Sequence, residues 1–141
     1  MKHKLVVIGF GTVGQGLAEI LHARASELEA ANGVRFAVVA VSDLLKGSVY
    51  HPDGLDLAEL LTLARAGQRL DAYPDRPGVI KGWDSLSTIA AAQADTVVEV
   101  SWTDVKTGQP AIEHVKAAFA SGKHAVLTLS LIHISEPTRP Y

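Results

Sequence analysis

The sequence predicts an α/β domain built on a doubly wound parallel sheet. Apolar, β-forming runs alternate along the chain with segments of helical periodicity, and a cluster of glycines follows the first run. Strands that alternate with helices favour parallel pairing through right-handed crossovers. A length of 141 residues with 48% hydrophobic composition suits one globular domain. The net charge of −2 gives no electrostatic case for nucleic acid or an anionic membrane, and the absence of cysteine excludes disulfides and thiolate chemistry.

The first strand runs directly into a glycine motif. Residues 5–8 are Leu-Val-Val-Ile, and Gly9, Gly11 and Gly14 follow at the spacing G-x-G-x-x-G. In a strand–turn–helix context each glycine has a role: Gly9 turns the chain, Gly11 leaves the backbone open to a pyrophosphate, and Gly14 lets the helix pack closely. The helix N-terminus then faces the phosphates. The motif therefore predicts a Rossmann-like, dinucleotide-binding domain, against the alternative of a plain structural turn.

The first half of the chain continues this alternation. Residues 13–31 are expected to form one amphipathic helix that ends near Gly33, a typical helix stop. Residues 35–41 form a nearly continuous apolar run, typical of a strand covered on both faces. Residues 44–54 are expected to form a loop, after which Asp56 caps a helix that extends to about residue 66.

The second half repeats the pattern with shorter elements. An irregular connection is expected at 67–78, a short strand at 79–83, a helix from Asp84 or Ser85 to residue 92, a buried strand at 95–101 and a polar loop at 102–108. Pro110 suits the start of a helix that ends at Gly122, and residues 123–128 are expected to form the next strand. Residues 1–128 thus make up the predicted dinucleotide-binding domain.

Asp43 follows the second expected strand, where an acidic residue usually accepts hydrogen bonds from the adenosine ribose. It lies further beyond Gly14 than the usual distance of about 20 residues. The alternative role for Asp43 is a cap on the local turn. NADP would call for a nearby cation, and Lys46 could reach a 2′-phosphate, which leaves NADP open. Val41, just before Ser42, supplies no such charge, so the sequence slightly favours NAD as cofactor.

The loop after residues 95–101 should also reach the cofactor, because ligands bind beyond the carboxyl ends of the strands in such sheets. Ser101 and Thr103 offer hydroxyl groups there, and Trp102 offers a flat apolar face for a nicotinamide or ribose. A helix cap and a packing aromatic are the equally open alternatives.

Other polar residues give no catalytic assignment. The six histidines have no metal-ligand spacing, so no metal site is expected; His114 is expected on a helix surface and His124 at a strand start. Glu99 stands out as a carboxylate inside an apolar strand, and we expect backbone donors or a lysine to satisfy it. No Ser-His-Asp order supports covalent catalysis.

Three segments, residues 9–16, 47–57 and 97–126, resemble the N-terminal, cofactor-binding part of homoserine dehydrogenase. The first segment is common to many dehydrogenases, whereas the other two are more specific. The resemblance implies NAD(P)-dependent interconversion of homoserine and aspartate 4-semialdehyde, in threonine and methionine biosynthesis. It also implies that Phe10, Thr12 and Val13 contact the pyrophosphate region and that Ser101 and Thr103 flank the nicotinamide.

The chain departs from this family after Thr128, where the family continues with Asn-Lys-Gly-Pro, whose lysine lies at the active site. Residues 129–141 are therefore expected to be a non-native tail, similar to translated adapter or vector DNA. The substrate and dimerisation domain is expected to be absent, so that the fragment binds cofactor only. A nucleotide-sensing module without catalysis and another amino-acid dehydrogenase are the alternatives.

The sequence also sets expectations about location and partners. Lys2 and Lys4 precede an apolar stretch as in a secretory signal, but glycines interrupt that stretch, so a cytoplasmic protein is expected. No apolar run approaches the roughly 20 residues that span a bilayer. The expected partner is a small-molecule substrate in a full-length protein that forms a homo-oligomer, with neither nucleic acid nor membrane.

Overall fold

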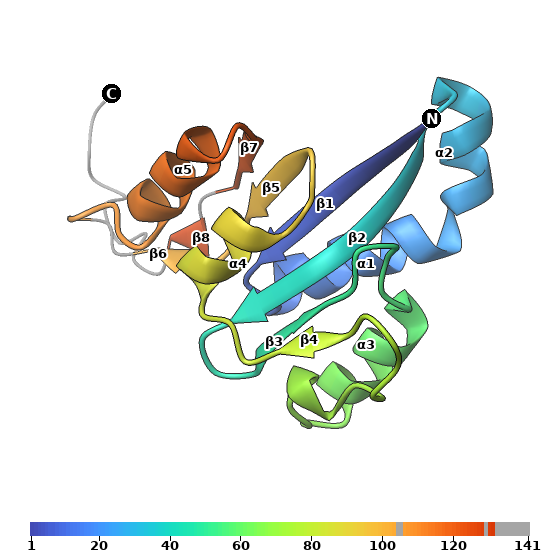
Figure 1. The fold of residues 1–141 in the computed structure, drawn as a ribbon, viewed down its shortest axis with the longest axis horizontal. Coiled ribbons are helices and arrows are strands. Elements are labelled where there is room, and N and C mark those ends of the chain that lie inside the picture. The colour runs from blue at the N-terminus through green and yellow to red at the C-terminus, as the bar shows by residue number, and fades with distance from the viewer. Residues whose placement is uncertain (104–105, 129, 132–141) are drawn as a thin grey trace, which may run out of the picture.

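A computed structural model describes residues 1–103, 106–128 and 130–131. Residue 129 and residues 132–141, most of the tail expected to be non-native, lie outside the described residues. The described part forms a central sheet with helices on both faces (Figure 1). The predicted fold class, an α/β domain with a doubly wound sheet, is confirmed.

The main sheet has six strands in the order β4-β3-β2-β1-β5-β7. Their bounds are Lys2–Ile8 for β1, Arg35–Asp43 for β2, Gly47–Tyr50 for β3, Ile80–Lys81 for β4, Thr96–Glu99 for β5 and His124–Leu127 for β7. Strand β1 pairs in parallel with both β2 and β5, and β5 pairs in parallel with β7. The carboxyl ends of these four strands therefore meet at one edge of the sheet.

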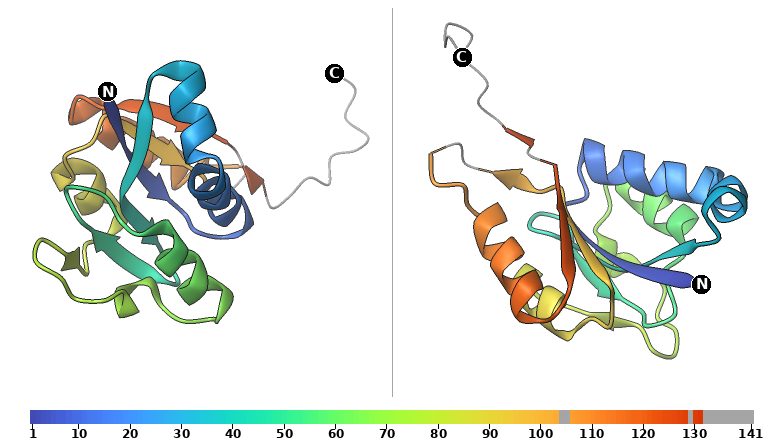
Figure 2. Two further views of the ribbon diagram at one scale, coloured as in Figure 1. Left: turned by 90° about the vertical axis from the view of Figure 1, so that its right-hand side faces the viewer. Right: turned by 90° about the horizontal axis from the view of Figure 1, so that it is seen from above.

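The helices form one layer on each side of this sheet. Helices α1 (Thr12–Ala23), α2 (Ala25–Asn32) and α3 (Leu57–Arg65) lie on one face with the short 3-10 helix η1 (Leu70–Ala72), and α4 (Ser85–Ala91) and α5 (Ala111–Ala120) lie on the other (Figure 2). The short strands β6 (Trp102–Thr103) and β8 (Ser130–Leu131) pair separately in parallel.

Alternation along the strands divides the core between the two faces. In β1, Leu5 and Val7 pack toward α1 and α3, whereas Val6 and Ile8 pack toward α4 and α5. This arrangement follows from the period of two along a strand. It explains why the central strands are apolar at nearly every position.

Several boundaries differ from those predicted. The polar loop expected at 102–108 contains β6. The single helix expected at 13–31 is divided into α1 and α2 at Arg24, whose backbone (φ −115°, ψ 21°) leaves the helical region. The second helix nevertheless ends as predicted, at Gly33 in the left-handed conformation (φ 67°). The loop expected at 44–54 contains β3, which runs antiparallel to β2, so the sheet is mixed rather than wholly parallel.

The predicted starts of two helices are confirmed in detail. The Asp56 carboxylate accepts a hydrogen bond from the Glu59 N–H at the start of α3, and the Asp84 carboxylate accepts one from the Ser87 N–H at the start of α4. These contacts satisfy backbone donors that have no partner within the helix. The capping carboxylates of α3 and α4 could therefore be predicted from the sequence.

Candidate nucleotide site

The candidate site begins at the turn between β1 and α1. Gly9 has φ +98°, a conformation that L-residues rarely adopt, and its N–H donates to the Ser42 carbonyl of β2 at 2.7 Å. A Cβ atom at Gly9 would lie 2.7 Å from both the N and Cα atoms of Ser101. The turn is thus in contact with the backbone that follows β5, and only glycine fits there.

The other two glycines of the motif differ from each other in their surroundings. A Cβ at Gly14 would lie 2.4 Å from the Gly9 carbonyl oxygen, so this glycine allows the start of α1 to approach the turn. A Cβ at Gly11 would meet no atom within 4 Å. The space in front of Gly11 is therefore open, on the side where the motif predicts a ligand.

Helix α1 offers its amino end at the same place. Gly11 is the cap residue and makes no side-chain hydrogen bond to the helix, and the first turn contains no acidic residue. The first backbone N–H groups of any α-helix lack acceptors within the helix, and the helix dipole adds partial positive charge. This end of α1 can therefore bind an anion such as a phosphate.

The residues between the glycines occupy different environments. Phe10 is fully buried, with its side chain in the core between the sheet and α1. Its N–H donates to the Asp43 Oδ2 at 2.7 Å. Thr12 and Val13, in contrast, are exposed on the first turn of α1.

Asp43 organises the end of β2. While Oδ2 accepts the Phe10 N–H, Oδ1 accepts the N–H groups of Leu45 and Lys46 at 2.9 and 3.0 Å. The alternative role as a turn cap is confirmed, and Asp43 also joins the turn to the glycine motif. A carboxylate has about four acceptor positions, so these three bonds leave capacity for a ribose hydroxyl, and that role remains a prediction.

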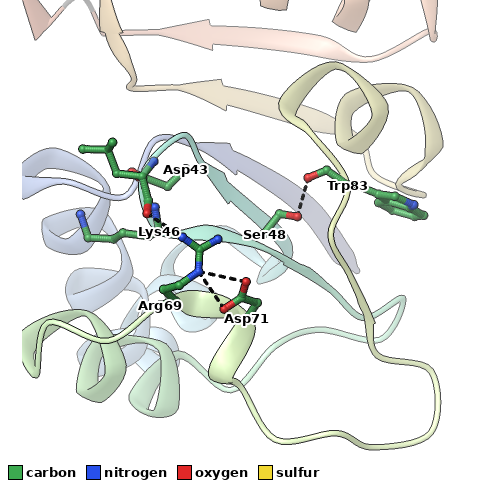
Figure 3. A network of polar contacts seen from close by, with 7 residues as sticks. Asp43, Lys46, Ser48, Arg69, Asp71 and Trp83 are labelled. Carbon is green, nitrogen blue, oxygen red and sulfur yellow. Dashed lines mark hydrogen bonds and ion pairs between the residues drawn. The ribbon is translucent and has the colours of Figure 1, made fainter.

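A cation that sequence reasoning missed lies beside this turn. Arg69, which follows α3, donates to the Leu45 carbonyl at 3.1 Å and pairs with Asp71 (Figure 3). The Leu70 N–H donates to the Lys46 carbonyl at 2.7 Å. Arg69 lies far from Asp43 in the sequence, in a segment expected to be irregular, so no local pattern indicated its position.

Ser101 lies between the glycine turn and Glu99. Its N–H donates to the Glu99 Oε1 at 2.6 Å, and its hydroxyl donates to the same oxygen. The neighbouring Val100 N–H donates to the Ile8 carbonyl at 2.9 Å. The structure brings the Ser101 backbone against the glycine motif, and the predicted contact of Ser101 with the nicotinamide stays a prediction. The side chains of Trp102 and Thr103 lie outside the described part of the structure.

Glu99 and His114 form a buried pair, which corrects one expectation. Glu99 is 1% exposed and His114 is 4% exposed, and the His114 Nδ1 contacts the Glu99 Oε2. The expected helix-surface position of His114 is wrong. The expected backbone donor to Glu99 is the Ser101 N–H, and the side-chain partners of Glu99 are His114 and Ser101 rather than a lysine. Ala111, His114 and Ala118 share the buried face of α5, and this i, i+3, i+7 spacing was the signal that could have revealed it. His124 is exposed at the start of β7, as predicted.

Two other features bear on function within residues 1–103, 106–128 and 130–131. No group of three or more His, Asp or Glu side chains in these ranges could hold a metal ion. The helices in these same ranges are all too short or too polar to cross a membrane.

Sequence comparisons identify relatives of this domain. Residues 1–117 match the family model described as Glutamate/Leucine/Phenylalanine/Valine dehydrogenase. The chain is 32% identical over 122 residues to a homoserine dehydrogenase from Methanocaldococcus jannaschii, covering 86% of this chain and 35% of that protein. It is 32% identical over 127 residues to an NAD(+)-dependent homoserine dehydrogenase from Pseudomonas canavaninivorans, covering 90% of this chain and 35% of that protein.

Structural comparison gives the same result. A hyperthermophilic archaeal homoserine dehydrogenase in complex with NADPH matches with a TM-score of 0.73 and 25% identity, over 92% of this chain and 36% of that one. The chain thus spans about a third of the length of the relatives that it matches. It belongs to the amino-acid dehydrogenase family of the matching model, as a homologue of the N-terminal, NAD(P)-binding region of homoserine dehydrogenases.

Proposed function

We propose that residues 1–128 bind NAD or NADP as the cofactor domain of a homoserine dehydrogenase. The observation that carries this proposal is the open space at Gly11 in front of the amino end of α1. In this proposal the α1 N-terminus, with Thr12 and Val13, binds the pyrophosphate. Gly9 and Gly14 hold the surrounding backbone in place.

The two ends of the cofactor would then lie on either side of this turn. Asp43 would accept hydrogen bonds from the adenosine ribose, and Lys46 and Arg69 would provide positive charge for a 2′-phosphate. Ser101, Trp102 and Thr103 would border the nicotinamide. The names of two homologues, one NAD(+)-dependent and one in complex with NADPH, support a nicotinamide cofactor without deciding between the two forms.

The proposed reaction of the whole protein is the reversible reduction of aspartate 4-semialdehyde to homoserine. A bound nicotinamide supplies the hydride, and the protein must hold the aldehyde at reacting distance. The residues assigned in this chain hold only the hydride donor. We therefore expect the 141-residue chain to bind cofactor without turnover, and oxidation of NADPH by the purified chain with aspartate semialdehyde would contradict this.

Another amino-acid dehydrogenase is the second candidate, because the matching family model carries the names of four such enzymes. The two curated relatives favour homoserine dehydrogenase instead. An assay of the full-length protein separates the two: homoserine should support NAD(P) reduction, whereas glutamate, leucine, phenylalanine and valine should not. Cofactor binding without turnover of any of these substrates would favour a nucleotide-sensing module.

Calorimetric titration of the chain with NADH and with NADPH tests the proposal directly. Saturable 1:1 binding of at least one nucleotide is the expected result, and no heat with either would contradict it. Lys46→Ala should weaken the binding of NADPH more than that of NADH, because only NADPH carries the 2′-phosphate. We also propose a cytoplasmic homo-oligomer for the full-length protein, which cell fractionation and light scattering would test.

A further inference from the structure

Glu99 is a buried carboxylate that the proposed cofactor contacts do not use. It is the last residue of β5, pairs in register with Ile8 and Leu127, and its side chain points to the face covered by α4 and α5. A buried carboxylate is costly unless it is fully hydrogen-bonded. Within the described residues, no buried side-chain nitrogen or oxygen lacks a hydrogen-bond partner.

The two oxygens of Glu99 have separate tasks. Oε2 contacts the His114 Nδ1 on α5, and the His114 Nε2 lies 2.8 Å from the Ser85 Oγ at the start of α4. Oε1 accepts both the N–H and the hydroxyl of Ser101. With an ionised carboxylate, Nδ1 must carry the hydrogen, and the Ser85 hydroxyl can either donate to or accept from Nε2.

Ser85, His114 and Glu99 are arranged as hydroxyl, imidazole and carboxylate, the order found in serine hydrolases. In this chain, however, the carboxylate also accepts hydrogen bonds from Ser101, whose backbone contacts the glycine turn. Its N and Cα atoms are the atoms that leave no room for a Cβ at Gly9. A shift of the Ser101 backbone would therefore change its packing against Gly9.

We propose that Glu99 is a positioning residue, which, held by His114, fixes Ser101 and through it the nucleotide-binding turn at Gly9. The expected effect of Glu99 on nucleotide binding rests on the proposed function. The coupling of Glu99 to the turn does not, and it can be measured without any nucleotide. The Gly9 N–H bonds to Ser42 and the Phe10 N–H bonds to Asp43, so exchange of these two amides reports opening of the turn.

The test compares Glu99→Gln and Glu99→Leu with Val97→Ala, a core change on the same strand and the same face. Glutamine retains an oxygen for Ser101 but makes the hydrogen bonds neutral, whereas leucine removes them. Amide exchange at Gly9, Phe10 and Ser101 should increase about fivefold in the first variant and more than tenfold in the second. Amide exchange in α3, and amide exchange at the turn in Val97→Ala, show how much of the increase comes from general destabilisation of the fold.

Nucleotide binding provides the second measurement. The Kd for NADPH should rise by about the same factors in the two Glu99 variants and stay within about twofold of the wild-type value in Val97→Ala. Equal changes in exchange at the turn and in α3, or an unchanged turn in the folded Glu99→Gln variant, would overturn the inference. If the wild-type chain binds no nucleotide, the proposed function fails, and amide exchange still decides whether Glu99 positions the turn.

His114 offers a conservative rescue. Asparagine at this position can donate to Glu99 as Nδ1–H does, whereas leucine leaves the Glu99 Oε2 without its partner. His114→Asn should therefore retain slow exchange at Gly9 and Ser101, and His114→Leu should lose it. Equal exchange in both folded variants would contradict the role assigned to His114.

Discussion

At the scale of single residues, the three glycines of one motif satisfy three different requirements. Gly9 needs a positive φ and a close contact with Ser101, Gly14 needs a close contact with the Gly9 carbonyl, and Gly11 faces open space. Structural necessity therefore explains the first and third glycines without a ligand. Gly11 caps α1 but is the one glycine of the three where a Cβ would meet no neighbouring atom, which makes it the most informative position for function.

The contrast between Gly9 and Gly11 gives a direct prediction. Gly9→Ala combines an unfavourable φ with a backbone collision and should lower the free energy of unfolding by about 1–3 kcal/mol. Gly11→Ala should cost less, about 0.5–1 kcal/mol, because alanine is a poorer N-cap residue than glycine. It should nevertheless weaken NADPH binding, because its methyl group enters the open space. Urea unfolding and calorimetry measure both effects. Unchanged NADPH affinity in Gly11→Ala would remove the main support for the nucleotide site.

Residue roles were predictable where the cause lies nearby in the sequence. The turn-capping role of Asp43 follows from its place at the end of an apolar run, and its N–H donors Leu45 and Lys46 are close neighbours. The pairing of Glu99 with His114 depends on how α5 packs on the sheet, which no local pattern fixes. Arg69 was missed for the same reason.

At the scale of elements, the helix starts follow from single carboxylates. Asp84 caps α4, and the hydrogen bond from the Ser87 N–H lowers the pKa of its carboxyl below the usual value of 3.8. The ionised form is thus favoured in the folded state. Its contribution to stability is present above the unfolded-state pKa and is lost as the pH falls through the lower folded-state pKa.

Asp84→Asn tests this linkage, because asparagine is also a good cap but does not titrate. The wild-type chain should have the higher Tm at neutral pH, and the difference in Tm should shrink as the pH falls below 3.8. Thermal unfolding of both proteins between neutral pH and pH 3, at constant ionic strength, measures the difference. A difference that does not change with pH would contradict an ionised cap.

Element boundaries were harder to predict where tertiary packing overrides local pattern. Gly47, Pro52 and Gly54 favoured a loop at 44–54, yet β3 pairs with β2, and its Ser48 hydroxyl donates to the Trp83 carbonyl. That contact joins residues distant in sequence. Similarly, the interruption at Arg24 occurs inside a segment with continuous helical periodicity.

At the scale of the whole molecule, alternating strands and helices were sufficient to predict the fold class. The two helical layers share one sheet, and residues on both faces of the inner strands β1, β2, β3 and β5 are buried. The antiparallel pair β3 and β4 at one edge was not predicted, because the parallel rule applies to strands joined by helical crossovers. The glycine turn and Ser101 follow parallel strands, so this error did not affect their predicted position, whereas Lys46 lies in the turn that joins β2 to β3.

A shared sheet implies that both layers unfold together. Leu60 of α3 and Ile89 of α4 are both fully buried, on opposite faces. Leu60→Ala and Ile89→Ala should each lower the free energy of unfolding by about 2–5 kcal/mol. Leu86→Ala, on the exposed side of α4, is the control and should change it by less than about 0.5 kcal/mol.

Two probes then distinguish one cooperative unit from two layers. Trp83 packs against Tyr50 on the α4 and α5 side, and in a Trp102→Phe background it is the single tryptophan, so its fluorescence reports that layer. Far-UV circular dichroism reports helices on both faces. Leu60→Ala should lower the midpoint of both signals equally, although it lies on the opposite face from Trp83, because both layers lose their packing when the sheet separates. A fluorescence midpoint that stays at its original temperature while circular dichroism shifts would mean that the two layers unfold independently.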